Sequence, residues 1–467
     1  DRPAVRPEKT RLYLFAGDAT PTLDRIRLTG KGRAQKDAEA PGDGTVTRAS
    51  AGLGAWLLSK VSRPKVVVGC DARHRSADFQ RATAEVLAAA GCEVILLPAQ
   101  LPTPVTAFAV RHLGADAGVM VTASHNPPQD NGYKVYLGGR VVAGDNEAGV
   151  QLISPADKEI AALIAEAGWA DEVPRSTDGV TPVDVLDDYL ARAVSLVPSE
   201  DRDLPIVITA MHGVGGEVLR TVLERAGFTR VIPVSEQFAP DPDFPTVAFP
   251  NPEEDGTLDL ACALAERVGA DLILALDPDA DRCAVAVPER QFTGDEIGAV
   301  LGWDVAFRAT GGTLACSNVS SRLLGKIAAH HGLGFAETDT GFKWIARVPD
   351  LIFGYEEALG YCVDPQFVAD KDGITACLRV AEVASKSDLV TLLDDLGERF
   401  GHHVTRQIAV RVERAAGEKV VREIGPDRVI VRPSGTEPKI KYYYEAVAPT
   451  RAEAQARLDR LVADRHP

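Results

Sequence analysis

The sequence predicts three α/β units with mixed or parallel sheets, followed by a smaller C-terminal α+β unit. Three observations support this fold class. The chain has 467 residues, too many for a single core, since domains commonly hold about 150 residues. One pattern of strand, helix and strand occurs three times, and after about residue 395 it gives way to alternating strands and one helix. The expected units span residues 1–190, 191–294, 295–392 and 393–467.

The repeated pattern predicts parallel strands joined by right-handed crossovers. Each of the three helices ends at a glycine just after its last apolar turn, where a left-handed C-cap is common. The strand, helix and strand of the three copies are expected at residues 65–69, 77–91 and 93–98, at 205–210, 215–227 and 230–234, and at 312–317, 320–332 and 334–338.

The residue patterns at the two ends of the chain differ from the repeated strand, helix and strand pattern. Residues 402–412 alternate as a strand does, residues 428–447 predict two strands around a turn, and residues 453–465 form an amphipathic helix pattern. Residues 11–48 are expected to be irregular, because residues 29–45 hold no aliphatic or aromatic side chain larger than alanine and so bury little surface.

Composition excludes several classes of protein. Hydrophobic residues make up 45% and charged residues 25%, which is typical of a globular chain. A net charge of −16 argues against nucleic acid as a partner, and no apolar run is long enough to span a membrane. The seven cysteines are odd in number and form no C-x-x-C, and the first residues resemble no signal peptide. We therefore expect a cytoplasmic protein without a nucleic-acid or membrane partner. Small molecules are the expected partners, and the chain is expected to be a monomer or homodimer, although its composition does not decide between these states.

Ser124 lies on the first loop with a chemical signature. G-V-M-V-T predicts a strand, and the following A-S-H-N-P-P-Q-D-N-G is too rich in Pro, Asn and Gly to continue it. Open α/β sheets bind ligands at this end of their strands. His125 is the sequence neighbour of Ser124, which is poor geometry for a Ser–His proton relay, and there is no G-x-S-x-G elbow. The alternative is an ordinary turn.

Three aspartates follow an apolar strand, L-I-L-A-L, at alternate positions 277, 279 and 281. Side chains at i, i+2 and i+4 of an extended segment share a face, so the three carboxylates are expected to converge. Their repulsion is relieved most simply by a hard cation such as Mg²⁺. An EF-hand is excluded, because its sixth and twelfth positions hold Arg282 and Pro288. The alternative is a solvated acidic turn.

Two further loops carry polar groups suited to a sugar phosphate. In F-G-Y-E-E-A-L-G-Y-C (353–362), adjacent glutamates between glycines suit binding of sugar hydroxyls, although a solvated helix start fits equally well. In V-R-P-S-G-T-E-P-K (431–439), an arginine fork precedes a Ser-Gly-Thr turn, which suits a phosphate cradle as well as an ordinary β-turn.

Taken together, the four loops resemble the α-D-phosphohexomutase superfamily. The segments T-A-S-H-N-P, D-P-D-A-D-R, G-Y-E-E-A-L-G and R-P-S-G-T-E-P-K occur in the family's order between residues 122 and 439, and the resemblance covers roughly residues 50–467. It implies three α/β domains and a C-terminal α+β domain around a central cleft. It also implies a phosphoglucomutase or phosphomannomutase, an enzyme that exchanges hexose 1-phosphate and hexose 6-phosphate through a phosphoserine and a hexose 1,6-bisphosphate.

The resemblance assigns roles residue by residue. Ser124 would carry the phosphoryl group, and Lys134 would be the general acid or base, with His125 and Arg282 beside the reacting phosphate. The remaining positions would bind Mg²⁺ or substrate. The metal ligands would be the Ser124 phosphate, Asp277, Asp279 and Asp281, and the substrate-binding residues Lys343, Glu356, Ala358, Arg432, Ser434, Gly435 and Thr436. Asp370, Lys371 and Asp372 resemble a further family segment.

Two departures from the family pattern keep other functions open. Many hexomutases have serine where this chain has Ala358, and the E-E-A-L-G form looks closer to phosphopentomutase-like and glucose-bisphosphate-linked mutases. The family's opening F-G-T-x-G-x-R-G has no clear equivalent, and Arg25, Arg27 and Arg33 are not expected to replace its arginine, so an impaired sugar-phosphate binder is an alternative. A haloacid-dehalogenase-type phosphatase fits poorly, because the fifth position of its D-x-D-x-[TV] motif is Asp281.

Overall fold

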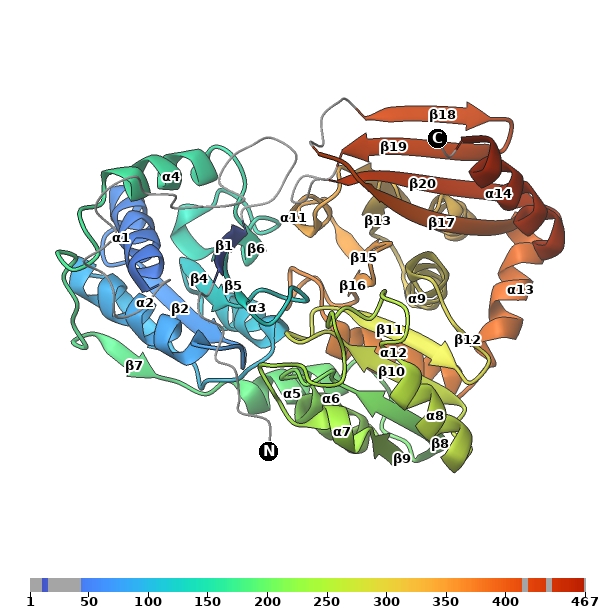
Figure 1. The fold of residues 1–467 in the computed structure, drawn as a ribbon, viewed down its shortest axis with the longest axis horizontal. Coiled ribbons are helices and arrows are strands. Elements are labelled where there is room, and N and C mark those ends of the chain that lie inside the picture. The colour runs from blue at the N-terminus through green and yellow to red at the C-terminus, as the bar shows by residue number, and fades with distance from the viewer. Residues whose placement is uncertain (1–10, 16–42, 414–418, 434–438, 466–467) are drawn as a thin grey trace.

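Four β-sheets follow one another along the chain. The computed structural model describes residues 11–15, 43–413, 419–433 and 439–465. Figure 1 shows the sheets and their helices in an arc, from the blue N-terminal unit to the red C-terminal strands. The predicted fold class, three α/β units and a C-terminal unit, is confirmed. None of the helices in the described ranges combines the length and the hydropathy that a membrane span requires.

The first sheet is mixed and has helices packed against it. Its core strand β2 (Lys65–Cys70) is buried from its second residue onward, because α1, α2 and α3 supply apolar side chains to its two faces. β5 (Asp130–Leu137) runs antiparallel to β4 (Ala117–Val121) and parallel to β1 (Arg11–Phe15). The other elements of this unit are α1 (Asp43–Lys60), α2 (Ser76–Ala90), β3 (Glu93–Leu96), α3 (Thr103–His112), the short 3₁₀ helix η1 (Gly139–Val141), β6 (Val150–Gln151), α4 (Ala156–Glu166) and β7 (Val180–Pro182).

The second and third sheets share one apolar core. Leu219 of α6, Leu274 of β10, Val300 of α9 and Phe353 of β15 belong to one buried cluster. The cluster also includes Phe108 of α3, so the first unit packs against this shared core. The second unit consists of α5 (Leu186–Val194), β8 (Arg202–Thr209), α6 (Gly216–Arg225), β9 (Phe228–Pro233), α7 (Ser235–Phe238), α8 (Asp259–Val268), β10 (Leu272–Leu276), β11 (Cys283–Val287) and β12 (Arg290–Gln291). The third consists of α9 (Gly294–Arg308), β13 (Thr313–Ser317), α10 (Leu323–His331), β14 (Gly334–Thr338), α11 (Phe342–Ile345), β15 (Leu351–Glu356), β16 (Gly360–Cys362) and α12 (Gly373–Ala384).

The fourth sheet is antiparallel, in the order β17-β20-β19-β18. Its small core lies between the sheet and α14, and includes Val429, Tyr444 and Leu458. The strands and helices of this unit are α13 (Leu389–Phe400), β17 (His402–Arg411), β18 (Val420–Ile424), β19 (Asp427–Pro433), β20 (Lys439–Ala448) and α14 (Arg451–Arg465). The sequence prediction missed β18, a largely exposed edge strand whose V-V-R-E-I sequence does not alternate between apolar and polar residues.

The prediction that residues 11–48 are irregular is wrong at both ends. Residues 11–15 form β1, in parallel register with β5, and α1 begins at residue 43. The R-L-Y-L-F segment contains two aromatic residues, which are enriched in β-strands. Arg25, Arg27 and Arg33 lie outside the described residues.

Helices occupy two of the predicted unit boundaries. Residues 190 and 392 fall inside α5 and α13. α5 packs against both α3 and α6, and α13 packs against both α9 and β17. Each of these two helices therefore contacts both of the units that it joins.

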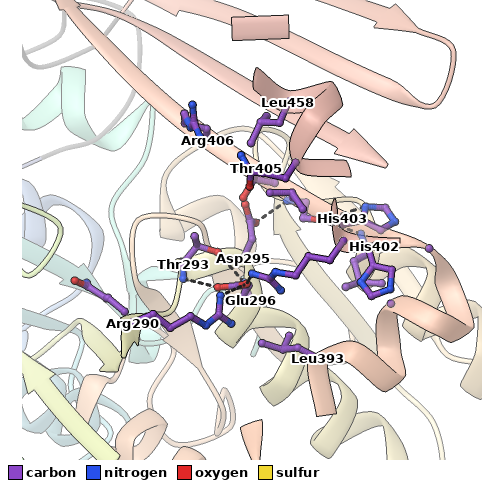
Figure 2. A pocket seen from close by; sticks show the side chains of 18 residues that line it. Arg290, Thr293, Asp295, Glu296, Leu393, His402, His403, Thr405, Arg406 and Leu458 are labelled. Carbon is purple, nitrogen blue, oxygen red and sulfur yellow. Dashed lines mark hydrogen bonds and ion pairs between the residues drawn. The ribbon is translucent and has the colours of Figure 1, made fainter. Parts of the chain in front are cut away.

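Glu445 joins the fourth unit to the third. It is buried on β20 and accepts hydrogen bonds from His403, from Ser321 and from the backbone and side chain of Arg322. Arg428 also pairs with it, at 3.3 Å. A cavity of about 150 Å³ lies at this junction and is lined by residues of α9, β17 and α14. Figure 2 shows its lining side chains, with Asp295 and His403 among them. Polar contacts therefore hold the fourth unit in place around this small cavity.

Replacing Glu445 with alanine is expected to destabilise the protein by about 3–5 kcal/mol, because it leaves buried cations without their anion. Burial alone would raise the pKa of Glu445, but the His403 hydrogen bond and the Arg428 and Arg322 charges hold it well below its usual value. The carboxylate therefore stabilises the fold above the unfolded pKa, and this contribution is lost as the pH falls through the folded pKa. Calorimetry should show a large difference from wild type at neutral pH and a smaller one in acid.

The exposed Glu453 of α14 is a matched control, since Glu453→Ala should leave unfolding nearly unchanged. A wild-type melting profile for Glu445→Ala at neutral pH would contradict the role of this junction.

Candidate active site

Asp277, Asp279 and Asp281 follow β10 and converge, as the sequence predicts. One carboxylate oxygen from each lies within 4.8 Å of the others, and all three side chains are buried. The expected extended segment is instead a turn, in which Ala280 has φ 60° and its N–H bonds the carbonyl of Asp277. Burial and the charges of Asp279 and Asp281 raise the pKa of Asp277 well above its ordinary value. The three buried carboxylates therefore favour a bound cation.

The carboxylate set fits a hard divalent ion. Among the described residues, Oδ1 of Asp279 and Oδ1 of Asp281 are buried without a hydrogen-bond partner. Buried carboxylate oxygens are seldom left unpaired, and Mg²⁺ binds such oxygens preferentially. The donors present therefore match the predicted metal.

Ser124 lies on the loop after β4 and faces this cluster. Its hydroxyl donates to Oδ2 of Asp277 at 3.1 Å, and Nδ1 of His125 lies 3.3 Å from the same hydroxyl oxygen. The backbone of Ser124 has φ 50°, the left-handed region, and its N–H donates to the Thr122 hydroxyl at 2.9 Å. A non-glycine residue persists in this conformation only where its surroundings fix it, and such residues occur often at reactive sites.

Two lysines contact the carboxylates. Nζ of Lys134, on β5, lies 2.6 Å from Asp279 and 2.7 Å from Asp281, and Nζ of Lys371 lies 3.2 Å from Asp281. Burial alone would lower the pKa of Lys134, but the charges of Asp279 and Asp281 raise it above its usual value. Lys134 is therefore a protonated group beside the carboxylates that Ser124 faces.

His125 and Arg282 add a ring and a cation to the surroundings of Asp277 and Ser124. Burial and the charge of Arg282 lower the pKa of His125 well below its ordinary value, so the ring is neutral at pH 7. The guanidinium of Arg282 pairs with Glu253 at 3.2 Å, while its backbone N–H donates to Asp277 at 3.0 Å. Arg282 thus belongs to the cluster, with Glu253 as its counterion.

Glu356 and Ala358 lie where β15 turns into β16. Glu356 accepts a hydrogen bond from the backbone of Gly341 at 2.7 Å, and burial raises its pKa. Lys343, on the adjoining α11, is buried. A cavity of about 270 Å³ borders this loop and is lined in part by Glu253 and Glu357. Glu253, which lines this cavity, pairs with Arg282 next to the three aspartates. The cavity of Figure 2 is not lined by Glu253.

Arg432 lies near the end of β19. Its guanidinium donates to the Tyr443 hydroxyl at 3.2 Å and packs over that ring, and its Nε is buried without a partner among the described residues. Ser434, Gly435 and Thr436, the rest of the predicted cradle, lie outside the described residues.

Family models for all four domains match the chain. They are the α/β/α domains I, II and III of phosphoglucomutase/phosphomannomutase at residues 32–170, 186–291 and 293–400, and the C-terminal domain at 378–463. The chain belongs to the phosphoglucomutase/phosphomannomutase family. This confirms the resemblance to the α-D-phosphohexomutase superfamily, and with it the prediction of a phosphohexomutase enzyme.

Individual members of the phosphoglucomutase/phosphomannomutase family resemble the chain over most of its length. A probable phosphomannomutase of Haemophilus influenzae is 43% identical, with 90% of this chain and 95% of that protein covered. The human phosphopentomutase is 33% identical, with coverages of 87% and 82%. Among solved structures, a putative phosphomannomutase from Thermus thermophilus superimposes with a TM-score of 0.76 at 25% identity, covering 91% of this chain and 96% of that one.

Sequence reasoning missed several residues at this phosphohexomutase site. Thr103, the first residue of α3, donates its hydroxyl to Asp279 at 2.5 Å and its N–H to the Asp279 carbonyl at 2.9 Å. Glu253 pairs with Arg282, and Arg73 contacts the Ser124 loop. Lys371 carried no assigned role. Single polar residues at helix starts and in loops give no periodic signal, so only the spatial contacts identify them.

Proposed function

We propose that this phosphohexomutase interconverts the 1-phosphate and 6-phosphate of a hexose, glucose or mannose, with Ser124 as the phosphoryl carrier. The observation that supports this most strongly is the 3.1 Å contact of the Ser124 hydroxyl with Asp277, one of three converging aspartates. A nucleophile, a cation site and a charged lysine are the parts that phosphoryl transfer needs in one place.

Asp277, Asp279 and Asp281, with the phosphate on Ser124, would hold Mg²⁺. The ion would supply neutralisation of charge on the transferring group. Thr103 and Lys134 would hold the carboxylate of Asp279 in its orientation through their hydrogen bonds.

The protein's own side chains account for the rest of the proposed reaction. Phosphorylated Ser124 would pass its phosphoryl group to the free hydroxyl of a hexose monophosphate. As the bond between phosphorus and Oγ of Ser124 breaks, protonated Lys134 would donate a proton to Oγ and would then take up the proton that the sugar hydroxyl loses. The resulting hexose 1,6-bisphosphate would turn over within the site and return the other phosphate to Ser124. His125, neutral through burial, and Arg282 would lie beside the reacting phosphate.

Binding of the rest of the substrate is assigned to the third and fourth units. Glu356 and Ala358 would contact the sugar, with Lys343 beside them. Arg432, Ser434, Gly435 and Thr436 would hold the phosphate that is not transferred. A cytoplasmic location and a monomeric or homodimeric state remain predictions.

A second candidate is a phosphopentomutase. Ala358 replaces the serine of many hexomutases, and phosphopentomutases are among the relatives that match most of the chain. A smaller side chain at this position changes the contacts that a sugar makes with the loop.

Incubating the protein with glucose 1-phosphate, mannose 1-phosphate and ribose 1-phosphate in separate reactions tests these candidates. Each reaction holds Mg²⁺ and a trace of the matching bisphosphate, and phosphorus NMR follows the products. Conversion of a hexose 1-phosphate to the 6-phosphate supports the proposal, and faster conversion of ribose 1-phosphate supports the second candidate. Release of inorganic phosphate would indicate a phosphatase, and no change an impaired binder; either result would overturn the proposal.

Replacing Arg432 with alanine is expected to raise KM by about ten- to a hundredfold, because a charge-assisted phosphate contact is worth roughly 1.5–3 kcal/mol. Phosphorylation of Ser124 should change far less. Arg422, exposed on the neighbouring strand β18, is the matched control. An unchanged KM in Arg432→Ala would place this loop away from the substrate.

A further inference from the structure

Arg73 fixes the backbone of the loop that carries Ser124. It follows β2 of the first sheet, 51 positions from Ser124 in the chain, and its side chain is 1% exposed. Its two terminal nitrogens donate to four carbonyl oxygens of one loop. The acceptors are Ser124 and Asn126, both at 2.6 Å, Pro127 at 2.9 Å and Asp130 at 3.1 Å.

These contacts use all the terminal donors of the guanidinium. An arginine has five N–H groups, four of them on the terminal nitrogens, and here each of the four has a carbonyl. The fifth, on Nε, lies beside Asp71 at 3.5 Å. This Nε has no hydrogen-bond partner among the described residues and faces the Asp71 carboxylate as its counterion. The terminal donors of Arg73, which are the ones a phosphate would need for a two-point contact, are therefore all taken by the serine loop.

The position of Arg73 is itself fixed from two sides. Asp71 accepts a hydrogen bond from the backbone of Arg73 at 3.0 Å and another from Ser76 at 2.5 Å. From the second unit, the ring of Phe244 lies 5.0 Å from the guanidinium carbon. Contacts with Asp71 and Phe244 thus fix the guanidinium in the position from which it binds the loop carbonyls.

The loop needs such a support because Ser124 is in the left-handed region, at φ 50°. Backbone of this kind relaxes unless several contacts fix it. The Ser124 carbonyl bond from Arg73 and the Thr122 bond to the Ser124 N–H hold the two peptide groups on either side of its Cα. A shift of the hydroxyl by about 1 Å is enough to slow a positioned reaction up to roughly a hundredfold.

We propose that Arg73 is a positioning residue for the phosphoryl carrier, setting the geometry of Ser124 through the loop carbonyls without contacting the phosphate. This inference rests on the proposed role of Ser124. It predicts a specific requirement for the planar fork of arginine, since lysine offers a point charge and at most three donors for four carbonyls.

Arg73→Lys tests this requirement, with Arg202→Lys as the matched control. Arg202 is also buried, donates to the carbonyls of Pro198, Glu200 and Ala226, and pairs with Glu382, but it lies at the start of β8 away from Ser124. For each protein we would measure kcat, KM, the melting temperature and the rate at which hexose 1,6-bisphosphate phosphorylates Ser124, the last by intact mass.

In Arg73→Lys, kcat and the rate of Ser124 phosphorylation should fall roughly ten- to a hundredfold, with KM within about threefold of wild type. Arg202→Lys should lower the melting temperature by about as much as Arg73→Lys does. At temperatures below its melting transition, Arg202→Lys should keep wild-type turnover. In Arg73→Ala, added guanidinium ion should restore part of the rate, and methylammonium should not.

Wild-type rates in Arg73→Lys, or equal losses in the two lysine variants, would overturn the positioning role. Equal restoration by the two cations would also overturn it, because the fork would then be unnecessary. If wild-type protein itself gains no phosphate on Ser124, the proposed function fails. If wild type is phosphorylated and Arg73→Lys matches it, only the role of Arg73 fails.

Discussion

Replacing Ser124 with alanine is expected to lower mutase turnover by about a thousandfold or more, because no other hydroxyl takes the place of a covalent carrier. The fold should persist, since the lost hydroxyl contacts only Asp277 and its neighbour His125 among the described residues. A coupled assay of 6-phosphate formation measures the first result, and circular dichroism measures the second.

The control for this variant is Ser195→Ala, an exposed serine whose hydroxyl bonds only the Arg192 carbonyl among the described residues. It should retain wild-type turnover. A Ser124→Ala enzyme that works within tenfold of wild type would show that another group carries the phosphate.

Asp279→Ala is expected to lower turnover by at least roughly a hundredfold, since loss of charge stabilisation at a metal site is worth several kcal/mol. It removes one of three converging carboxylates and leaves the hydroxyl of Thr103 and the ammonium of Lys134 without this acceptor. Titration calorimetry should show weaker Mg²⁺ binding, and a higher Mg²⁺ concentration should be needed for half-maximal activity.

Asp271, exposed just before β10, provides the control at the other end of the same strand. Asp271→Ala should keep wild-type Mg²⁺ affinity and turnover. Activity of the wild-type enzyme that survives EDTA unchanged would contradict a metal at these aspartates.

The fold could be predicted from the sequence where each element carries its own signal. The strand expected at residues 334–338 is β14 to the residue, and the helix expected at 77–91 is α2 at Ser76–Ala90, followed by the left-handed Gly91. Strand order could not be predicted, because the pairing of β1 with β5 depends on contacts between segments more than a hundred residues apart. β18 was missed because an exposed edge strand has no buried face to produce an alternating pattern.

The candidate site, like the fold, could be predicted from the sequence only in part. The three aspartates were predicted to converge because alternate positions of an extended segment share a face. They do converge, but through a turn at Ala280 instead of an extended segment. The support for Ser124 could not be predicted, because Arg73 binds main-chain carbonyls, which every residue has. Thr103 was missed for a similar reason, since it meets Asp279 only where the first and second units come together.

The measurement that tests the proposed role of Ser124 most directly is transfer of a labelled phosphoryl group through the enzyme. The protein would be phosphorylated with hexose 1,6-bisphosphate carrying labelled phosphate, separated from the sugar, and then mixed with unlabelled hexose 1-phosphate. We expect the label first on the peptide that contains Ser124 and then, within one turnover, in the sugar phosphates. Label on another residue, or label on Ser124 that does not pass to the sugar, would contradict the proposed mechanism.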